Sequence, residues 1–216
     1  HYRTTHLTGT ERVVDELIGG TMKDSLDLRQ YPDAPGTHQF FVNTGGKRAN
    51  PFQLPRPESV VVVGLGTEGN LRPSELTYTV RMGVLALAQR RYEQPAHDEP
   101  SFELAATMLG SGGAGITVGT AAQCIAQGVR EADQAIAELN ARLEAAGSGR
   151  GGRGGRGKRG APPPDAARRW PRVGHLLLVE LYLDRAAEAW RALKLQADST
   201  PGAYALADRL RFGPGA

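Results

Sequence analysis

Runs of hydrophobic residues along the chain predict four β-strands. The clearest run is the four consecutive valines in the segment 59–66, SVVVVGLG. An apolar run without alternation is typical of a strand buried on both faces, as in a parallel or mixed sheet covered by helices. Further strands are predicted around Phe40 and over the ranges Leu104–Met108 and Leu176–Tyr182. We expect these four strands to share one sheet.

Apolar residues at helical spacing predict helices between the strands. One helix should begin near Pro73, whose fixed backbone angle suits a first turn, and end near Arg91. Its inward face is predicted to carry Leu76, Val80, Val84 and Leu87. Shorter helices are predicted before Gly19-Gly20, over Asp184–Lys194 and around Tyr204–Leu210.

A longer apolar stripe predicts the longest helix of the chain. Its members recur at alternating spacings of four and three: Val118, Ala122, Ile125, Val129, Ala132, Ile136, Leu139 and Leu143. A stripe of this kind typically faces the core of the same domain. A coiled-coil seam for a partner helix is the alternative interpretation.

A glycine-rich loop joins the third strand to this long helix and is the candidate ligand site. Glycine lets a ligand approach the main chain, and the N–H groups of a helix N-terminus attract anions. The loop therefore has the form of a phosphate cradle, with Thr117 capping the helix and the loop Gly64–Gly69 as the opposite wall. The candidate ligand-binding residues are Gly64, Gly66, Gly110, Ser111, Gly112, Gly113, Ala114, Gly115 and Thr117.

Two known kinds of phosphate loop do not fit this sequence. No Lys-Ser/Thr pair follows the glycines, as a Walker loop requires, and no acidic residue closes a second strand as in a dinucleotide fingerprint. The alternative is a tight strand-to-helix turn without a ligand, in which the hydroxyl of Ser111 should face solvent. With or without a ligand, Gly113→Val and Gly115→Val are expected to destabilise the fold.

Positive charge is concentrated in one segment. The 216 residues carry a formal net charge of +3, but the stretch from Gly147 to Arg172 carries +7 and the remainder −4. Residues 146–169 are rich in Arg, Gly and Pro and cannot form a packed core, so we expect a disordered insert that acts as a solvated linker. Arg-Gly-Gly repeats also occur in RNA-binding tails, and nucleic-acid contact is the alternative.

The sequence contains no evident catalytic or metal-binding constellation. Cys124, the single cysteine, lies within the long helix and is predicted to be a buried structural thiol, which suits a reducing cytoplasm. The five histidines are too dispersed for a metal site, and no apolar run is long enough to span a membrane. Glu180, inside an apolar run, either has an ionic partner or marks the exposed face of an edge strand, which we favour. We expect no catalytic residue, metal or cofactor.

Three blocks of the sequence resemble known families when taken in order. LGSGGAGITVGTAA resembles the phosphate loop and helix of macro-type domains, although Thr117-Val118 replaces the aromatic or apolar residue and proline that the family often carries. SVVVVGLGTEGNLRPSELTYTVRMGVLALA resembles the non-catalytic N-terminal domain of leucyl aminopeptidases. With HLLLVELYLDRAAEAWRAL, they resemble the region that precedes the protease domain of bacterial CHAT proteins, which are caspase-like peptidases with a His/Cys pair.

This resemblance covers about Asp24 to Leu195 and implies a fold and a function. The fold would be an α/β, three-layer α/β/α sandwich with a mixed sheet, in one macro-like domain over residues 2–197 with a tail at 198–216. The function would be a non-catalytic regulatory or protein-interaction module, whose partner is another protein or an adjacent protease domain. The alternative is binding of ADP-ribose or another phosphate-bearing nucleotide. The short stretch Asn43-Thr44-Gly45-Gly46 matches the catalytic motif of macro-type hydrolases too poorly to imply their activity.

Overall fold

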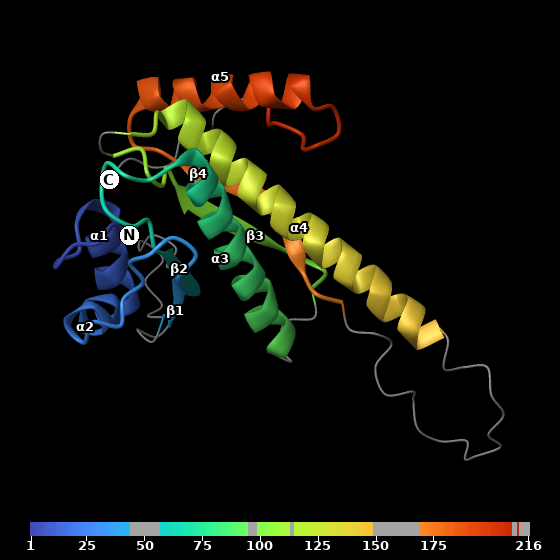
Figure 1. Ribbon diagram of the computed structural model, residues 1–216, viewed down its shortest axis with the longest axis horizontal. Helices are drawn as coiled ribbons and strands as arrows, with labels where there is room; N and C mark the ends of the chain where they lie inside the picture. Colours follow the sequence, from blue (N-terminus) through green and yellow to red (C-terminus); the bar gives the residue numbers. More distant parts are fainter. Residues whose placement is uncertain (44–56, 95–98, 113–114, 149–168, 209–210, 212–216) are drawn as a thin grey trace, which may run out of the picture.

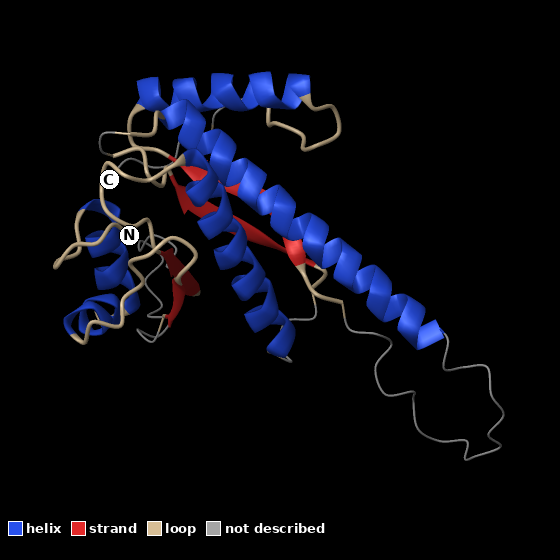
Figure 2. Cartoon of the chain, in the orientation of Figure 1, coloured by secondary structure: helices blue, strands red, loops and turns tan. Residues whose placement is uncertain are grey.

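The computed structural model describes residues 1–43, 57–94, 99–112, 115–148, 169–208 and 211. Within these ranges the chain is a mixed α/β protein with five helices and four strands (Figures 1 and 2). In chain order they are α1 (Gly9–Ile18), α2 (Thr21–Asp27), β1 (His38–Val42), β2 (Ser59–Val63), α3 (Pro73–Glu93), β3 (Ser101–Thr107), α4 (Val118–Ser148), β4 (Arg172–Val179) and α5 (Leu183–Ser199). Gly113, Ala114 and most of the predicted insert lie outside the described residues.

The helices confirm most of the helical pattern of the sequence. α3 begins at Pro73, and its four predicted inward residues are all buried. The stripe of α4 is buried from Val118 to Ile136, so it packs into the protein's own core and not into a coiled-coil seam. α1 ends at Gly19, whose φ of 101° is a left-handed conformation that favours glycine. The second N-terminal helix, α2, was not predicted.

The four predicted strands exist, but the prediction of one shared sheet is wrong for the described residues. β1 and β2 form an antiparallel pair in which Phe40 lies opposite Val61. β3 and β4 form a separate parallel pair in which Leu104 lies opposite Leu176. A hydrophobic run specifies which side chains are buried, and it does not specify which strands exchange hydrogen bonds. The two pairs are joined instead by side-chain packing.

The two sheets differ in how helices cover them. One face of β1–β2 packs against α1 and α2, with Phe41 and Val62 beside Ile18 and Met22. Its other face packs against α3, with Val63 in the main core. In contrast, β3–β4 packs against α3 and α4 through one face only, which carries Leu104, Ala106, Leu176 and Leu178. In Figure 1, α3 and α4 lie in front of this second sheet.

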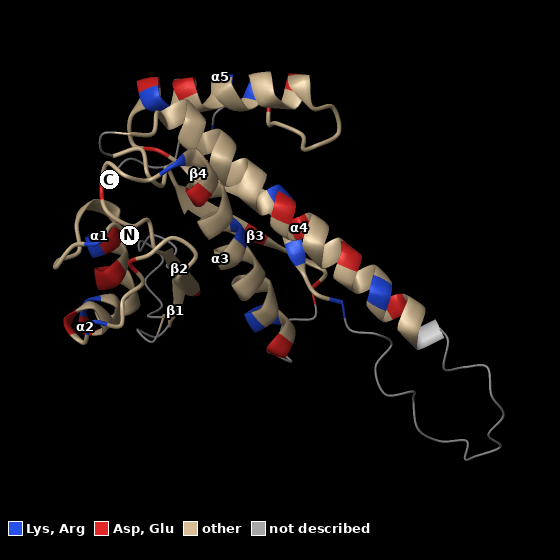
Figure 3. Cartoon of the chain, viewed as in Figure 1, with Lys and Arg blue, Asp and Glu red and all other residues tan. Residues whose placement is uncertain are grey.

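The long helix α4 is held between α3 and α5. Its first turns, from Val118 to Val129, carry no charged residue, and charges begin at Arg130 (Figure 3). Gly128 allows a close approach, because a Cβ there would lie 2.6 Å from the carbonyl oxygen of Thr77 on α3. On the other side, Gln123 donates a hydrogen bond to the carbonyl of Ala192 on α5 (2.8 Å).

The C-terminal tail packs back onto the fold. The helix predicted around Tyr204–Leu210 is absent from residues 204–208, which the structure describes as irregular chain. Tyr204 instead packs against the cluster between α4 and α5, and its hydroxyl donates to the carbonyl of Leu193 (3.0 Å). Tertiary packing has replaced local helical preference here.

Candidate functional site

The two glycine loops of the sequence meet in the structure. Gly110 has a φ of 79°, and a Cβ there would lie 2.8 Å from Leu71, so the position requires glycine for conformation and for space. Gly115 has a φ of 143° and faces the carbonyl oxygen of Gly69, 3.7 Å from an added Cβ. Gly112 borders open space. The predicted adjacency of the two loops is therefore present at Gly69 and Gly115.

Gly64 and Gly66 use their own N–H groups within the fold. The N–H of Gly64 donates a hydrogen bond to the backbone carbonyl of Thr37 (3.0 Å), and the N–H of Gly66 donates one to the backbone carbonyl of Asp33 (2.7 Å). Thr79 also donates its hydroxyl to the carbonyl of Gly64 (3.0 Å). These contacts fix the end of β2 against the preceding loop. A ligand at this wall would have to bind through other groups.

Ser111 is buried in a polar network. A purely structural loop was expected to leave its hydroxyl facing solvent, and the structure shows that the hydroxyl does not face solvent. Its Oγ donates to the carbonyl of Met108 (2.8 Å) and accepts a hydrogen bond from the guanidinium of Arg185 (2.8 Å). Arg185 also forms an ion pair with Glu180 at 3.0 Å. Glu180 lies just beyond β4 and not on the exposed face of an edge strand, which corrects the favoured interpretation. A carboxylate that is only 10% exposed needs such a partner.

The N-terminus of α4, the predicted anion site, is capped by the chain itself. Thr117 accepts a hydrogen bond from the N–H of Thr120 (3.2 Å), which confirms its predicted capping role. The carboxylate of Glu188 on α5 accepts one from the N–H of Gly119 (3.2 Å). A carboxylate beside a helix N-terminus is stabilised by the helix dipole, as a phosphate would be. The roles of Arg185 and Glu188 were not predicted from the sequence. Their only signal there is that they are two charged residues among the alanines of a helix with an apolar face.

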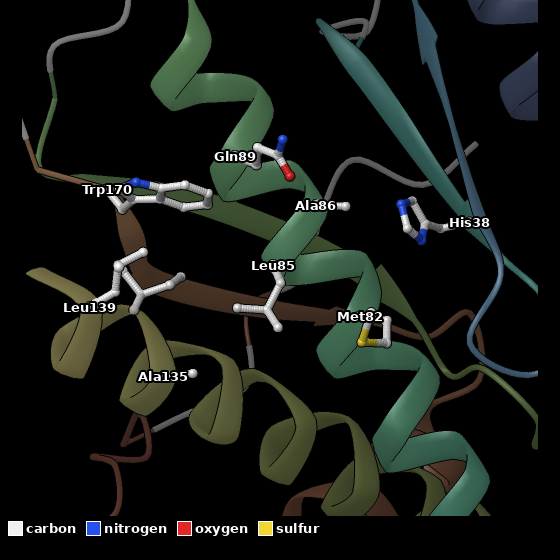
Figure 4. A pocket seen from close by; sticks show the side chains of 9 residues that line it. His38, Met82, Leu85, Ala86, Gln89, Ala135, Leu139 and Trp170 are labelled. Carbon is white, nitrogen blue, oxygen red and sulfur yellow. The ribbon is translucent and has the colours of Figure 1, made fainter.

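A second feature, an apolar groove on the outer side of α3, was also missed. Its volume is about 370 Å³. Figure 4 shows Met82, Leu85 and Ala86 of α3 along its floor, with Leu139 of α4 and Trp170 on one side and His38 of β1 on the other. The sequence signal was that α3 has apolar residues outside its inward stripe.

The tryptophan at the end of the groove is fixed in place. Its ring stacks on Tyr92 with centroids 5.1 Å apart. Its backbone N–H donates to Asn140 (2.8 Å), and its carbonyl accepts from the same side chain (3.0 Å). At the opposite end, Nδ1 of His38 is buried without a hydrogen-bond partner among the described residues. The groove is therefore preformed, with an aromatic ring held rigidly at one end.

Cys124 is buried, as predicted. Burial raises the pKa of its thiol above the ordinary value, while a hydrogen bond with Thr77 opposes the shift. A raised pKa suppresses the thiolate that nucleophilic catalysis needs. His175 lies on β4, opposite Glu103 of β3 in the strand register. Both residues are on the sheet face turned away from the core, so His175 does not face Cys124.

Neither a metal-ligand cluster nor a membrane-spanning helix occurs among the described residues. No group of three or more His, Cys, Asp or Glu side chains there could hold a metal ion. None of the described helices combines the length and apolar character needed to cross a bilayer.

Comparison with known proteins adds no family assignment. No protein-family model matches the chain, and no curated protein matches it.

Proposed function

We propose that this chain is a non-catalytic protein-interaction module that regulates a larger bacterial protein of the CHAT-protease type. The observation that carries the proposal is the preformed apolar groove over α3 and α4. Concave, mostly apolar surface is a common location for binding sites. Its partner would be an apolar segment of another protein or of an adjacent protease domain, in the cytoplasm. The proposed fold is a macro-like α/β/α sandwich over residues 2–197.

The groove suits a polypeptide ligand. Its apolar lining favours the burial of aliphatic or aromatic side chains, each of which contributes about 1.5–3 kcal/mol when fully buried. Trp170 is the kind of anchored aromatic residue that dominates binding energy at interfaces.

Photo-crosslinking tests this proposal. A benzophenone amino acid at Leu139, in the groove, should yield adducts with a defined protein or with the adjacent domain when the parent protein is expressed in bacteria. Ala86→Arg fills the groove and should remove those adducts. The matched control is the exposed Ala145, near the end of α4, where neither the crosslinker nor an arginine should matter. Equal adduct yields at Leu139 and Ala145 would count against the groove.

The non-catalytic part of the proposal has its own test. The isolated chain should not cleave fluorogenic peptides of the caspase type. Turnover that disappears in Cys124→Ser would assign protease activity to this chain and overturn the proposal.

Nucleotide binding is the second candidate function, and one observation favours it. Arg185 places a guanidinium 2.8 Å from the hydroxyl of Ser111, so a cation already lies beside the glycine loop. A diphosphate would take the N–H of Gly119 from Glu188 and pair with Arg185. Calorimetry with ADP-ribose tests this: we expect heat of binding that is lost in Arg185→Met. The absence of heat at millimolar ligand would remove this candidate.

A further inference from the structure

The size of the groove over α3 limits what it can hold. Its volume of about 370 Å³ lies near the lower end of ligand sites in proteins, which span about 300–1,000 Å³. One turn of an α-helix, about 10 Å wide and 5.4 Å long, occupies about 420 Å³ and already exceeds this space. The groove therefore receives one or two side chains of a partner and not a whole element of secondary structure. Recognition has to rest on the chemistry of those side chains.

The lining of the groove favours an aromatic side chain. The indole of Trp170 lies on one side and the imidazole of His38 on the other, with the thioether of Met82 on the floor between them (Figure 4). Aromatic rings stack on one another, and a thioether sulfur makes favourable contacts with ring edges. An aliphatic side chain in the same place would gain from burial alone. An aromatic side chain would gain from burial and from these contacts.

The indole of Trp170 is held in place, and part of it remains available to a partner. Tyr92 stacks on the ring at 5.1 Å and does not line the groove, so the part of the indole at the groove is not the face that Tyr92 covers. The backbone of Trp170 is fixed by two hydrogen bonds with the side chain of Asn140. A ring that is already ordered loses little freedom when a partner binds. Trp170 thus presents a preorganised aromatic surface.

Two polar groups of the groove match the main chain of a peptide. The Nε1–H of Trp170 has no hydrogen-bond partner among the described residues and is accessible to solvent, so it can donate to a carbonyl of the partner. Gln89 donates its amide N–H to Glu93 (2.8 Å), and its carbonyl oxygen accepts no hydrogen bond from the described residues. One donor and one acceptor complement the C=O and N–H that every peptide unit carries.

We propose that the groove recognises an aromatic side chain of its partner, which stacks on Trp170, and that Trp170 determines this specificity. The main chain beside that aromatic residue exchanges hydrogen bonds with Trp170 and Gln89. The inference rests on the proposed interaction function, and it specifies the chemistry that the partner segment presents.

Two blocked amino acids of nearly equal size test the inference: N-acetyl-phenylalaninamide and N-acetyl-cyclohexylalaninamide. The cyclohexyl ring is the more apolar of the two, so burial alone predicts that it binds at least as tightly as the phenyl ring. Stacking on Trp170 predicts the opposite order. By ligand-observed NMR, the phenyl compound should bind the intact chain with a Kd of about 1–10 mM, and the cyclohexyl compound at least about threefold more weakly.

Three variants locate the binding. Trp170→Leu should abolish the preference for the phenyl compound, and Ala86→Arg should abolish the binding of both compounds. The matched control is Tyr182→Leu, which removes an aromatic side chain that is 63% exposed outside the groove and should leave both affinities unchanged. In Trp190→Phe, Trp170 is the only tryptophan, and its fluorescence emission should change when the phenyl compound binds. Circular dichroism of each variant confirms that it is folded.

Three outcomes would overturn the inference. They are equal or tighter binding of the cyclohexyl compound, absence of binding of the phenyl compound up to about 50 mM, and equal loss of the preference in Tyr182→Leu and Trp170→Leu. If the cyclohexyl compound binds equally well and Ala86→Arg removes it, the groove binds apolar groups of any kind, so the interaction function stands and the aromatic specificity fails. If Leu139 yields no adducts while the preference for the phenyl compound remains, the interaction function fails and the aromatic specificity stands.

Discussion

Two charged residues of α5, Arg185 and Glu188, tie the glycine loop and the start of α4 to the C-terminal helix. Arg185 reaches Ser111 and Glu180 from one side, and Glu188 reaches the N–H of Gly119 from the other. The contacts with Ser111 and Gly119 join parts of the chain about 70 positions apart in sequence. An anion that entered the loop would compete with the carboxylate of Glu188 for the N–H of Gly119, and it would be attracted by the guanidinium of Arg185. The same helix, α5, therefore carries both a competing group and an anion-binding group.

Ser111→Ala is expected to lower the free energy of unfolding by about 1–2 kcal/mol, because it removes the acceptor of Arg185 and a buried donor to Met108. Urea denaturation measures the change. Ser101→Ala, at an exposed position that begins β3, is the control and should cost less than about 0.5 kcal/mol. Equal stabilities of the two variants would show that the Ser111 network contributes little.

Asp133 predicts a pH dependence of stability. Burial raises the pKa of its carboxyl above the ordinary value, while the N–H of Val173 (2.9 Å) and the charge of Arg172 oppose the shift. The native state therefore holds the proton more tightly than the unfolded state. The stability from this group is fully present below the unfolded-state pKa and is lost as pH rises through the folded-state pKa.

Asp133→Asn keeps an oxygen for Val173 and removes the titrating charge. The variant should melt at a higher temperature than the wild type at pH 7, and the difference should shrink toward pH 4. Thermal melts across that range make the comparison. A lower melting temperature at pH 7 would show that the charged form is the one that the fold stabilises.

At the level of helices and strands, glycines allow close packing where α4 crosses α3 and where α3 meets β2. Gly128 lies against the backbone of Thr77, while Gly83 lies against a side-chain methyl group of Val63. The obstacle at Gly128 is a helix carbonyl, which cannot rotate away. The obstacle at Gly83 belongs to a side chain that can adjust.

Gly128→Ala is therefore expected to destabilise the protein despite the helix preference of alanine. The preference contributes about 1 kcal/mol, and overpacking costs about 1–3 kcal/mol. Gly83→Ala should cost less, since Val63 can change rotamer. Denaturant midpoints of both variants test the order. If Gly128→Ala is the more stable variant, α3 and α4 can separate without cost.

The hydrophobic pattern predicted the elements well because burial is recorded in the period of the side chains. Val62, Val63 and the stripe of α4 from Val118 to Ile136 are buried as expected. The pattern did not predict that β2 and β3 belong to different sheets, since pairing depends on twist and packing between distant segments. The groove and the Arg185–Ser111 contact were missed for the same reason. Both are formed by residues that are far apart in sequence.

For the chain as a whole, we expect that the basic segment 149–168 can be replaced without loss of the fold. Its two ends come together, because Arg169 forms an ion pair with Glu144 of α4 (2.9 Å) and Trp170 is bonded to Asn140. A short linker can therefore replace residues 149–168. These residues carry +5, so their removal changes the formal net charge from +3 to −2.

Replacing residues 149–168 by a short Gly/Ser linker should leave the melting temperature unchanged within about 2 °C. Retention on a cation exchanger should be lost. Any RNA binding of the intact chain should fall steeply with salt and disappear with the segment. RNA affinity that survives the replacement would place nucleic-acid contact elsewhere, and a large drop in melting temperature would mean that the segment packs on the fold.

The position of that segment between β3 and β4 also bears on how the protein folds. Ser101 pairs with Arg172, 71 positions later, so this parallel pair can form only after a long loop has closed. Loop-closure entropy grows with the logarithm of length, and shortening the loop from about 70 to about 50 residues changes it by only about 0.3 kcal/mol. The folding rate should therefore change less than about twofold when the segment is removed. At this point in the connection, segments of very different length are kinetically almost equivalent.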